Sequence, residues 1–229
     1  MKILIAIDGA CRRNGKPDCT ASGGLFIQAF DDDGNDIGCC TRGAYEYCST
    51  NQRGELLALL KALNIVQKND YSDVTIVTDS EYIFNAMTKQ WYKNWIANRW
   101  LTRDGNPVKN RDLWENIAKY ADMCERAENE IIFYHVKGHC IPFGTVTANT
   151  SLESDKTGRA LLEMVQTKFD NVASSKRTLF EHAAELSEKN NGFAPDINGP
   201  VFKSWVVANV MADAIATKVV DEADSRRET

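Results

Sequence analysis

The sequence predicts an α/β protein whose central sheet includes parallel strands. Two short apolar runs, Lys2–Ile7 and Val74–Thr78, are predicted to be buried strands. Between them, Thr50–Lys68 repeats leucines and other apolar residues at helical spacing behind polar capping residues. A strand, a helix and a second strand in this order are the βαβ pattern of a sheet with parallel members, whose ligands bind beyond the carboxyl ends of the strands.

The other elements follow the same signals of periodicity and turn composition. Gly23–Phe30 and Ile37–Tyr45 flank a run of Asp, Gly and Asn, which predicts a hairpin. Residues 223–229 are expected to form a frayed polar tail. The remaining predicted elements are helices Ser80–Lys89 and Asp112–Ala127, strand Ile131–Val136, and helices Leu152–Phe169, Lys176–Lys189 and Lys203–Asp221.

Composition places the chain among ordinary globular proteins. It has 229 residues, 43% of them hydrophobic and 26% charged, which argues against disorder and fibrous repeats. No apolar run approaches the ~20 residues of a membrane-spanning helix, so we expect a cytoplasmic protein with no membrane partner. The seven cysteines include no C-x-x-C pair, and neither a disulfide framework nor a thiolate zinc site is indicated. The net charge of −5 argues against bulk attraction to nucleic acid.

Two aspartates directly follow the predicted strands. Asp8 comes after Lys2–Ile7, and Asp79 comes after Val74–Thr78. If these strands are parallel neighbours, the two carboxylates lie side by side at one edge of the sheet. The alternative is that each aspartate only turns or caps the chain, with Asp79 as the N-cap of the next helix.

Two more acids lie on helix faces that should be buried. At 3.6 residues per turn, Glu55 shares a stripe with Leu59, Ala62 and Val66. In the last helix, Asp213 lies on a stripe with Phe202, Val206, Asn209, Ala216 and Val220. For Glu55, a favourable interaction with the helix dipole is the alternative.

Carboxylates that gather in one place repel each other unless a cation neutralises them. No lysine or arginine recurs on these helix faces, so crowding several partly buried acids would cost several kcal/mol without a divalent ion. Ligands that are all oxygen suit Mg²⁺ or Mn²⁺ rather than zinc.

Five segments also carry a resemblance to a known family. In chain order they are Asp8-Gly9-Ala10-Cys11, Thr50-Asn51-Gln52-Arg53-Gly54-Glu55-Leu56, Thr78-Asp79-Ser80-Glu81-Tyr82, Val136-Lys137-Gly138-His139 and Ala212-Asp213. Together they resemble the ordered signature of type 1 ribonucleases H, over roughly residues 1–140 and 206–220. The resemblance implies the ribonuclease H-like fold, a mixed five-stranded sheet flanked by helices. It also implies an endonuclease that hydrolyses the RNA strand of RNA/DNA hybrids.

The resemblance assigns roles to the acids residue by residue. It makes Asp8, Glu55, Asp79 and Asp213 the metal-binding carboxylates and His139 the mobile catalytic histidine. It implies hydrolysis with two Mg²⁺ or Mn²⁺ ions, leaving 5′-phosphate and 3′-hydroxyl ends. His139 suits a proton shuttle or a product-release role because imidazole titrates near neutrality. The alternative is that His139 is a zinc ligand with His135 and Cys140.

One stretch is basic in an otherwise acidic chain. Residues 89–112 contain six Lys or Arg and two Asp, a net charge of +4 that leaves −9 for the rest of the chain. Trp91, Tyr92, Trp95 and Trp100 are interleaved with the basic residues. This pattern predicts salt-sensitive, sequence-independent contact with phosphates. Alternatively, Trp91 and Trp95 are core residues.

The same stretch resembles the basic protrusion with which bacterial ribonucleases H grip the DNA strand of a hybrid. It holds fewer lysines, so we expect weaker hybrid affinity. The resemblance implies substrate contacts by Lys93, Trp95, Arg99, Trp100 and Lys109. It further implies that backbone groups of Gly9, Ala10 and Cys11 meet the RNA ribose, whose 2′-OH distinguishes RNA. By the same resemblance, the hybrid backbone and bases contact Thr50, Asn51 and Gln52.

The chain departs from the family pattern between His139 and Asp213. These residues are separated by 73 others, far more than the pattern places there. Residues 145–204 are therefore predicted to be a helical insertion that loops out as a small lobe, with 1–144 and 205–222 forming the catalytic domain. The insertion is either an added substrate or partner surface or a passive appendage.

Smaller departures concern single residues. Arg12 and Arg13, beside the glycine-containing turn, are either solvated loop residues or extra phosphate contacts. Glu81 stands where the family often carries a neutral glutamine. Val210 replaces an acidic residue shortly before Asp213.

Two other functions stay open on the sequence. A structure-specific DNA nuclease or resolvase could use the same fold, and a hybrid-binding protein could retain the fold without catalysis. The Asn51-Gln52 pair argues against the first, and retention of all four acids with His139 argues against the second. Protein partners and the preferred metal are not indicated by the sequence.

Overall fold

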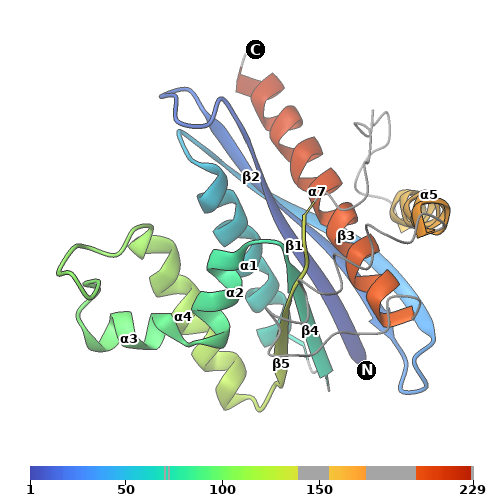
Figure 1. The fold of residues 1–229 in the computed structure, drawn as a ribbon, viewed down its shortest axis with the longest axis horizontal. Coiled ribbons are helices and arrows are strands. Elements are labelled where there is room, and N and C mark those ends of the chain that lie inside the picture. Colours follow the sequence, from blue (N-terminus) through green and yellow to red (C-terminus); the bar gives the residue numbers. More distant parts are fainter. Residues whose placement is uncertain (70, 72, 139–154, 174–199, 228–229) are drawn as a thin grey trace.

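A five-stranded sheet in the order β3-β2-β1-β4-β5 forms the centre of the molecule (Figure 1). The computed structural model describes residues 1–69, 71, 73–138, 155–173 and 200–227. β1 pairs antiparallel with β2 and parallel with β4, and the outer pairs are antiparallel β2–β3 and parallel β4–β5. The strands are β1 (Lys2–Arg12), β2 (Thr20–Phe30), β3 (Asp36–Tyr47), β4 (Asp73–Thr78) and β5 (Ile131–His135). The predicted mixed five-stranded sheet is confirmed.

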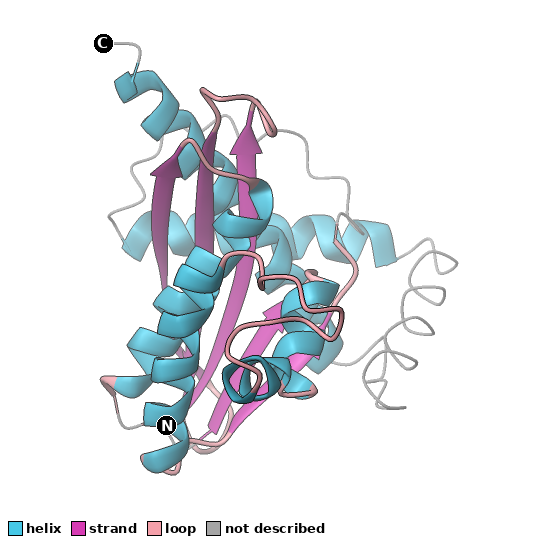
Figure 2. Ribbon diagram, turned by 90° about the vertical axis from the view of Figure 1, so that its left-hand side faces the viewer, coloured by secondary structure: helices cyan, strands magenta, loops and turns pink. Residues whose placement is uncertain are grey.

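Helices pack against both faces of this sheet (Figures 1 and 2). On one face, α1 and α4 bury a core that includes Leu59, Ile76 and Trp114. On the other face, α7 and α5 bury a second core that includes Phe26 and Met211. The described helices are α1 (Asn51–Gln67), α2 (Glu81–Thr88), α3 (Trp91–Ala97), α4 (Arg111–Arg126), α5 (Asp155–Ala173) and α7 (Pro200–Arg227).

Capping side chains determine where the first two helices begin. The Arg53 N–H donates to Thr50 Oγ1 at 3.4 Å at the start of α1, as the predicted capping residues suggest. At the start of α2 the cap is Ser80, whose hydroxyl accepts from the Ile83 N–H at 3.5 Å. Asp79 is therefore not the N-cap of α2.

β1 distributes its side chains between the two cores. Ile3, Ile5 and Ile7 join the core under α1, whereas Leu4 and Ala6 join the core under α7. Because successive side chains of a strand face opposite sides, Asp8 belongs to the α7 side of the sheet.

β1 is longer than the sequence suggests. It continues past Asp8 to Arg12, and the extra residues pair only with β2, in the register Gly9↔Gly23 to Arg12↔Thr20. Its pairing with β4 ends at Ile7↔Thr78. The residues after Ile7 are polar or small and form no apolar run, so periodicity does not predict this extension.

Two adjacent glycines of β2 let the flanking helices approach the strand from opposite sides. A Cβ on Gly23 would lie 2.6 Å from the Ala58 N of α1, and a Cβ on Gly24 would lie 2.9 Å from the Ala216 Cα of α7. Gly24 is the cross-strand partner of Asp8. Both helices therefore approach the sheet closely at the level of Asp8.

The expected polar tail is wrong for the residues that the structure describes. α7 extends to Arg227, and its final turns contact the body of the protein: Tyr47 Oη donates to the Ala223 carbonyl at 3.0 Å, and Ala223 is buried. The charged sequence of this segment suggests fraying, but its charges pair with residues of the sheet, as described below.

The described part of the predicted insertion does not stand apart as a lobe. Leu162, Val165 and Phe169 of α5 are buried in the second core, and Arg159 forms an ion pair of 3.7 Å with Asp36 at the start of β3. α5 therefore packs against α7 and β3. The boundaries 145–204 stay a prediction, and the predicted helix Lys176–Lys189 lies outside the described residues. Within the described chain, no helix combines the length and the apolarity that crossing a membrane requires.

Candidate active site

Asp8 and Asp79 lie at neighbouring positions at the edge where parallel pairing ends. Ile7 is opposite Thr78 in the β1–β4 register, so the next residue of each chain segment is an aspartate. Asp8 is 7% exposed. The predicted placement of these two acids is confirmed by the parallel register.

Glu55 reaches the same edge from α1. Its Oε2 accepts a hydrogen bond of 2.5 Å from the Ser80 hydroxyl, next to Asp79, and its Oε1 accepts one of 3.2 Å from the Asn51 side-chain amide. The first turn of α1 contains no acidic residue, so the helix-dipole explanation for Glu55 is wrong. The predicted stripe holds, since Leu59, Ala62 and Val66 are all buried.

Asp213 reaches the site from α7, on the other face of the sheet. Its helix neighbours Asn209 and Ala216 are buried, as the predicted stripe requires. Ala212 and Ala216 lie directly against Gly24, opposite Asp8 in the β1–β2 register. Asp213 therefore lies at the level of Asp8.

The four acids are close enough to influence one another's pKa. The pKa of Asp8 is raised well above its ordinary value of 3.8, first by burial, then by repulsion from Asp79 and Asp213, and less by Glu55. The Gly9 N–H donates to Asp8 Oδ1 at 2.6 Å and opposes this rise. Burial and repulsion from Asp79 also raise the pKa of Glu55. Coulomb repulsion of this kind acts at short range, so the structure brings all four predicted carboxylates into one cluster.

In their present rotamers, the acids of this cluster are not arranged around one point. Among the described residues, no three Asp, Glu, His or Cys side chains converge closely enough to hold a single metal ion as they stand. The bond from Ser80 holds Glu55 in its position.

The segment after β5 passes directly over Asp79. A Cβ on Gly138 would lie 3.1 Å from the Asp79 Cγ and closer still to Oδ2, so only glycine fits there without displacement. His139 and Cys140 follow Gly138 and lie outside the described residues. His135 is buried, and its Nε2 lies 3.0 Å from the Asp79 carbonyl oxygen, where an N–H can donate. His135 thus supports the backbone of Asp79, which sequence reasoning missed.

Gly9 and the start of α1, two of the segments expected to contact a substrate, adjoin Glu55 of the acidic cluster. A Cβ on Gly9 would lie 2.6 Å from the Glu55 N, so β1 touches α1 backbone to backbone at this point. At the start of α1, Thr50 is exposed and caps the helix, while Asn51 bonds to Glu55. Gln52 Oε1 accepts a bond of 3.1 Å from the Asn110 side-chain amide. The start of α1 is thereby linked to the basic stretch.

The basic stretch is further tied to α1 by Arg53. Its guanidinium pairs with Asp112 at 2.7 Å and with Glu46 at 2.6 Å, and both contacts raise its pKa. The ion pairs join β3, α1 and α4 on one side of the molecule. Arg99 and Lys109 are exposed on this stretch, and Trp100 stacks beneath Arg111, whose guanidinium carbon lies 5.8 Å from the ring.

Trp91 and Trp95 are part of the core boundary. Trp95 contacts Trp91, Tyr82 and Trp114, with its ring 5.2 Å from that of Trp114 and 6.3 Å from that of Trp91. Both tryptophans pack against the first core while remaining partly exposed. The core alternative accounts for their spacing, and their exposed portions are still available to a ligand.

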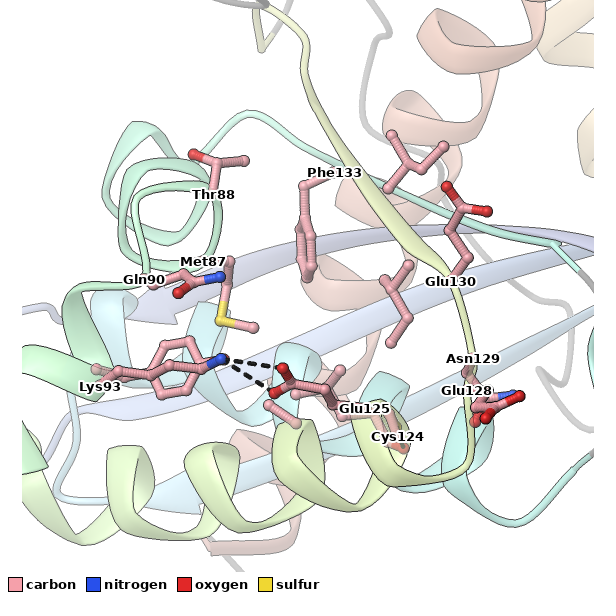
Figure 3. Close-up of a pocket in the computed structure, with 15 residues that line it drawn as sticks. Met87, Thr88, Gln90, Lys93, Cys124, Glu125, Glu128, Asn129, Glu130 and Phe133 are labelled. Atoms are coloured by element: carbon pink, nitrogen blue, oxygen red, sulfur yellow. Dashed lines mark hydrogen bonds and ion pairs between the residues drawn. The ribbon is translucent and has the colours of Figure 1, made fainter.

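Lys93 is paired with an acid outside the acidic cluster. Its Nζ pairs with Glu125 at 3.0 Å beside a cavity of about 540 Å³ between α4 and β5, and none of the four clustered acids lines that cavity (Figure 3). The structure therefore does not bring Lys93 together with Gly9, Asn51 and the other expected substrate contacts.

Arg12 and Arg13 are exposed, as the solvated interpretation expects, but each also forms an ion pair with α7. Arg12 pairs with Asp221 at 2.6 Å, and Arg13 pairs with Asp224 at 2.5 Å. Both partners lie on the last turns of α7, three residues apart and therefore on one helix face. This spacing is the signal that sequence reasoning missed.

A mixed sheet with acids gathered where β1 and β4 stop pairing, joined by one acid from a helix on each face, defines a ribonuclease H-like enzyme. Comparison with known proteins agrees with this class. The RNase H family matches residues 1–156. Ribonuclease H of Rickettsia felis is 37% identical over 148 residues, covering 65% of this chain and 86% of that protein, and ribonuclease HI of Rickettsia conorii is 36% identical over the same coverage. The chain belongs to the RNase H family.

Solved structures agree on the fold. LC9-RNase H1, described as a type 1 RNase H with the type 2 active-site motif, superimposes with a TM-score of 0.51 at 23% identity. The match covers 60% of this chain and 64% of that one. At this level of identity the likeness concerns the fold alone.

Proposed function

We propose that this protein is an endonuclease that hydrolyses the RNA strand of RNA/DNA hybrids with divalent metal ions. The observation that carries the proposal is that Asp8 and Asp79 lie side by side where β1 and β4 stop pairing, with Glu55 bonded to Ser80 next to them, in a chain of the RNase H family. Such a cluster is unfavourable without a ligand of opposite charge. The names of the Rickettsia relatives support the same activity.

The donor set fits Mg²⁺ or Mn²⁺. All four clustered side chains offer carboxylate oxygens, the ligands that hard divalent ions prefer, and the buried Asp8 is repelled by Asp79 and Asp213. Asp8, Glu55, Asp79 and Asp213 would hold the ions. When bound, two such ions lower the pKa of an attacking water and stabilise the leaving 3′ oxygen, which gives 5′-phosphate and 3′-hydroxyl ends.

Hydrogen bonds within the chain orient the acids of the site. The Gly9 N–H holds Asp8 Oδ1, Ser80 and Asn51 hold the two oxygens of Glu55, and the His135 ring supports the backbone of Asp79. Gly138 lets the backbone after β5 pass directly against the Asp79 carboxylate. His139, next in the chain, would move a proton to or from the reacting phosphate or assist product release.

Substrate binding would use the surface between β1 and the basic stretch. The backbone of Gly9, Ala10 and Cys11 would contact the RNA ribose. Thr50, Asn51 and Gln52 would contact the hybrid on the way to Trp95, Arg99, Trp100 and Lys109, a path supported by the bond from Asn110 to Gln52. Lys93, paired with Glu125 beside a separate cavity, is the weakest member of this set.

A cleavage assay with an end-labelled hybrid tests the proposal. We expect the wild-type protein to cut the RNA strand with Mg²⁺ or Mn²⁺ but not with chelator, and Asp79→Asn to be inactive under all three conditions. The parallel substrate is a DNA duplex of the same sequence. Cutting of the duplex instead of the hybrid would favour the resolvase alternative, and hybrid binding without any cutting would favour the non-catalytic one.

A further inference from the structure

The last two turns of α7 are attached to the sheet by two bidentate ion pairs. Arg12 donates from Nε and Nη2 to the two oxygens of Asp221 at 2.6 and 3.0 Å. Arg13 donates from Nη1 and Nη2 to the two oxygens of Asp224 at 2.7 and 2.5 Å. Bidentate guanidinium–carboxylate pairs fix orientation as well as distance. The end of the helix is therefore held in one position relative to the end of β1.

Further hydrogen bonds complete this attachment. Asp224 also accepts a bond of 2.8 Å from Thr20 Oγ1 at the start of β2, and its side chain is only 15% exposed. Tyr47 Oη, at the end of β3, donates to the Ala223 carbonyl, and Arg227 Nη1 donates to the Asp18 carbonyl at 2.8 Å. We call residues 221–227 with these partners the α7 clamp. It joins the ends of β1, β2 and β3.

The segments held by the clamp run directly into the expected substrate contacts. Arg12 follows Gly9–Cys11 in β1. Tyr47 is followed by Cys48 and Ser49 and then by Thr50–Gln52 at the start of α1. The Cys48 N–H donates to the Cys19 carbonyl at 2.7 Å, and the Cys19 thiol donates to the Ser49 carbonyl. A displacement of the clamp would therefore move both segments together.

These pairs lie at the end of a helix whose middle is anchored in the core. The middle of α7 is already anchored by Val206, Met211 and Ile215, which are fully or almost fully buried. Exposed ion pairs contribute little to unfolding free energy unless their geometry is bidentate or they form a network. Both conditions are met here, so the pairs can contribute to stability. They also fix the end of β1 relative to the end of α7.

We propose that Arg12, Arg13, Asp221 and Asp224 are positioning residues for hybrid binding. They hold Gly9–Cys11 and Thr50–Gln52 in the arrangement that meets the two strands of the substrate. This inference rests on the proposed function. It assigns Arg12 and Arg13 a role through α7 and not through direct contact with phosphate.

The test separates binding from chemistry. In Asp221→Asn/Asp224→Asn, we expect KM for the hybrid to rise about tenfold, which corresponds to ~1.4 kcal/mol, while kcat stays within about twofold. The exchange of charges in Arg12→Asp/Asp221→Arg should recover most of the loss seen in Arg12→Asp alone. The matched control is Asp170→Asn, which breaks the 2.6 Å pair with Lys203 at the other end of α7 and should leave KM unchanged.

A second measurement is independent of cleavage. Amide hydrogen exchange of residues 9–13 and 48–52, without substrate or metal, should become faster in the double variant and stay unchanged in Asp170→Asn. If the wild-type protein cuts no hybrid, the proposed function fails, but this exchange result still decides the positioning role. Unchanged KM and unchanged exchange, or an equal effect of Asp170→Asn, would overturn it. Should the double variant not fold, Asp221→Asn, which keeps the Thr20 bond, carries the same test.

Discussion

Asp8 and Asp224 lie along the same packing of β1 against α7, in opposite electrostatic surroundings. Asp8 is buried beside three other acids, and both effects raise its pKa. The neighbours of Asp224 are Arg13 and Thr20, and its pKa is lowered. The protein itself therefore stabilises the charged form of Asp224, whereas it destabilises the charged form of Asp8. The difference separates the α7 clamp, which fixes the position of a helix end, from the acidic cluster, which we propose to bind metal ions.

The largest test of this contrast is the neutralisation of Asp8. Asp8→Asn should reduce hybrid cleavage by at least about 100-fold, because a metal centre contributes several kcal/mol and each 1.36 kcal/mol is a factor of ten. The metal-free variant should nevertheless be more stable than wild type at neutral pH, since a repelled charge is removed. Steady-state cleavage and thermal unfolding with chelator measure the two effects. Asp33→Asn, in the exposed turn before β3, is the control. A less stable Asp8→Asn protein would contradict the account.

The next test adds a methyl group next to the acidic cluster without changing its charge. Gly138→Ala would place a methyl group against the Asp79 carboxylate, and we expect cleavage to fall between about 10- and 100-fold because small misplacements of reacting groups are costly. Cleavage rates with saturating Mg²⁺ measure it. Gly105→Ala, where nothing lies within 4 Å but φ is +78°, is a control for a generally strained glycine. Equal losses in the two variants would remove Gly138 from the site.

The third test removes the Ser80 hydroxyl and measures the pH dependence of cleavage. Its hydrogen bond lowers the pKa of Glu55 against burial and repulsion from Asp79. In Ser80→Ala that pKa rises, so the carboxylate form is lost at higher pH and the acid limb of the cleavage profile should move upward. Loss of the α2 cap should also cost about 1 kcal/mol of stability. Ser80→Thr keeps a hydroxyl and serves as the control. An acid limb at the same pH in Ser80→Ala would show that Glu55 does not limit the reaction.

The smallest effect concerns acid stability, where the two aspartates should act with opposite signs. The lowered pKa of Asp224 gives stability that is present above its ordinary value of 3.8 and is lost as pH falls through its folded-state value. The raised pKa of Asp8 works in reverse: the penalty is absent below 3.8 and grows as pH rises toward its folded-state value. Unfolding of Asp224→Asn and Asp8→Asn between pH 3 and 7 compares them. Curves of the same slope would contradict the assignment.

Much of the site follows from local sequence. Two acids that end apolar runs predict their own adjacency once the runs are parallel strands, and the β1–β4 register confirms it. Glu55 and Asp213 are visible as acids on otherwise apolar helix stripes. Their common location depends on how two helices pack on opposite faces, which periodicity does not report. The family resemblance supplied that step.

The misses have a common physical origin. The extension of β1, the length of α7 and the pairing of Arg12 and Arg13 all involve polar residues whose partners are distant in sequence. A charged segment is expected to be solvated, and only the three-dimensional arrangement shows that Asp221 and Asp224 face two arginines. The burial of α5 is similar, because its three buried side chains do not reveal which surface they cover.

The two glycines of β2 have a consequence for how this enzyme can be altered. Because they point to opposite sides, each touches a different layer: Gly23 touches α1, which carries Glu55, and Gly24 touches α7, which carries Asp213. A methyl group added to one or the other would push a single wall of the active site outward and leave the opposite wall in place. Substitutions at these two adjacent positions should therefore change the position of Glu55 and of Asp213 independently.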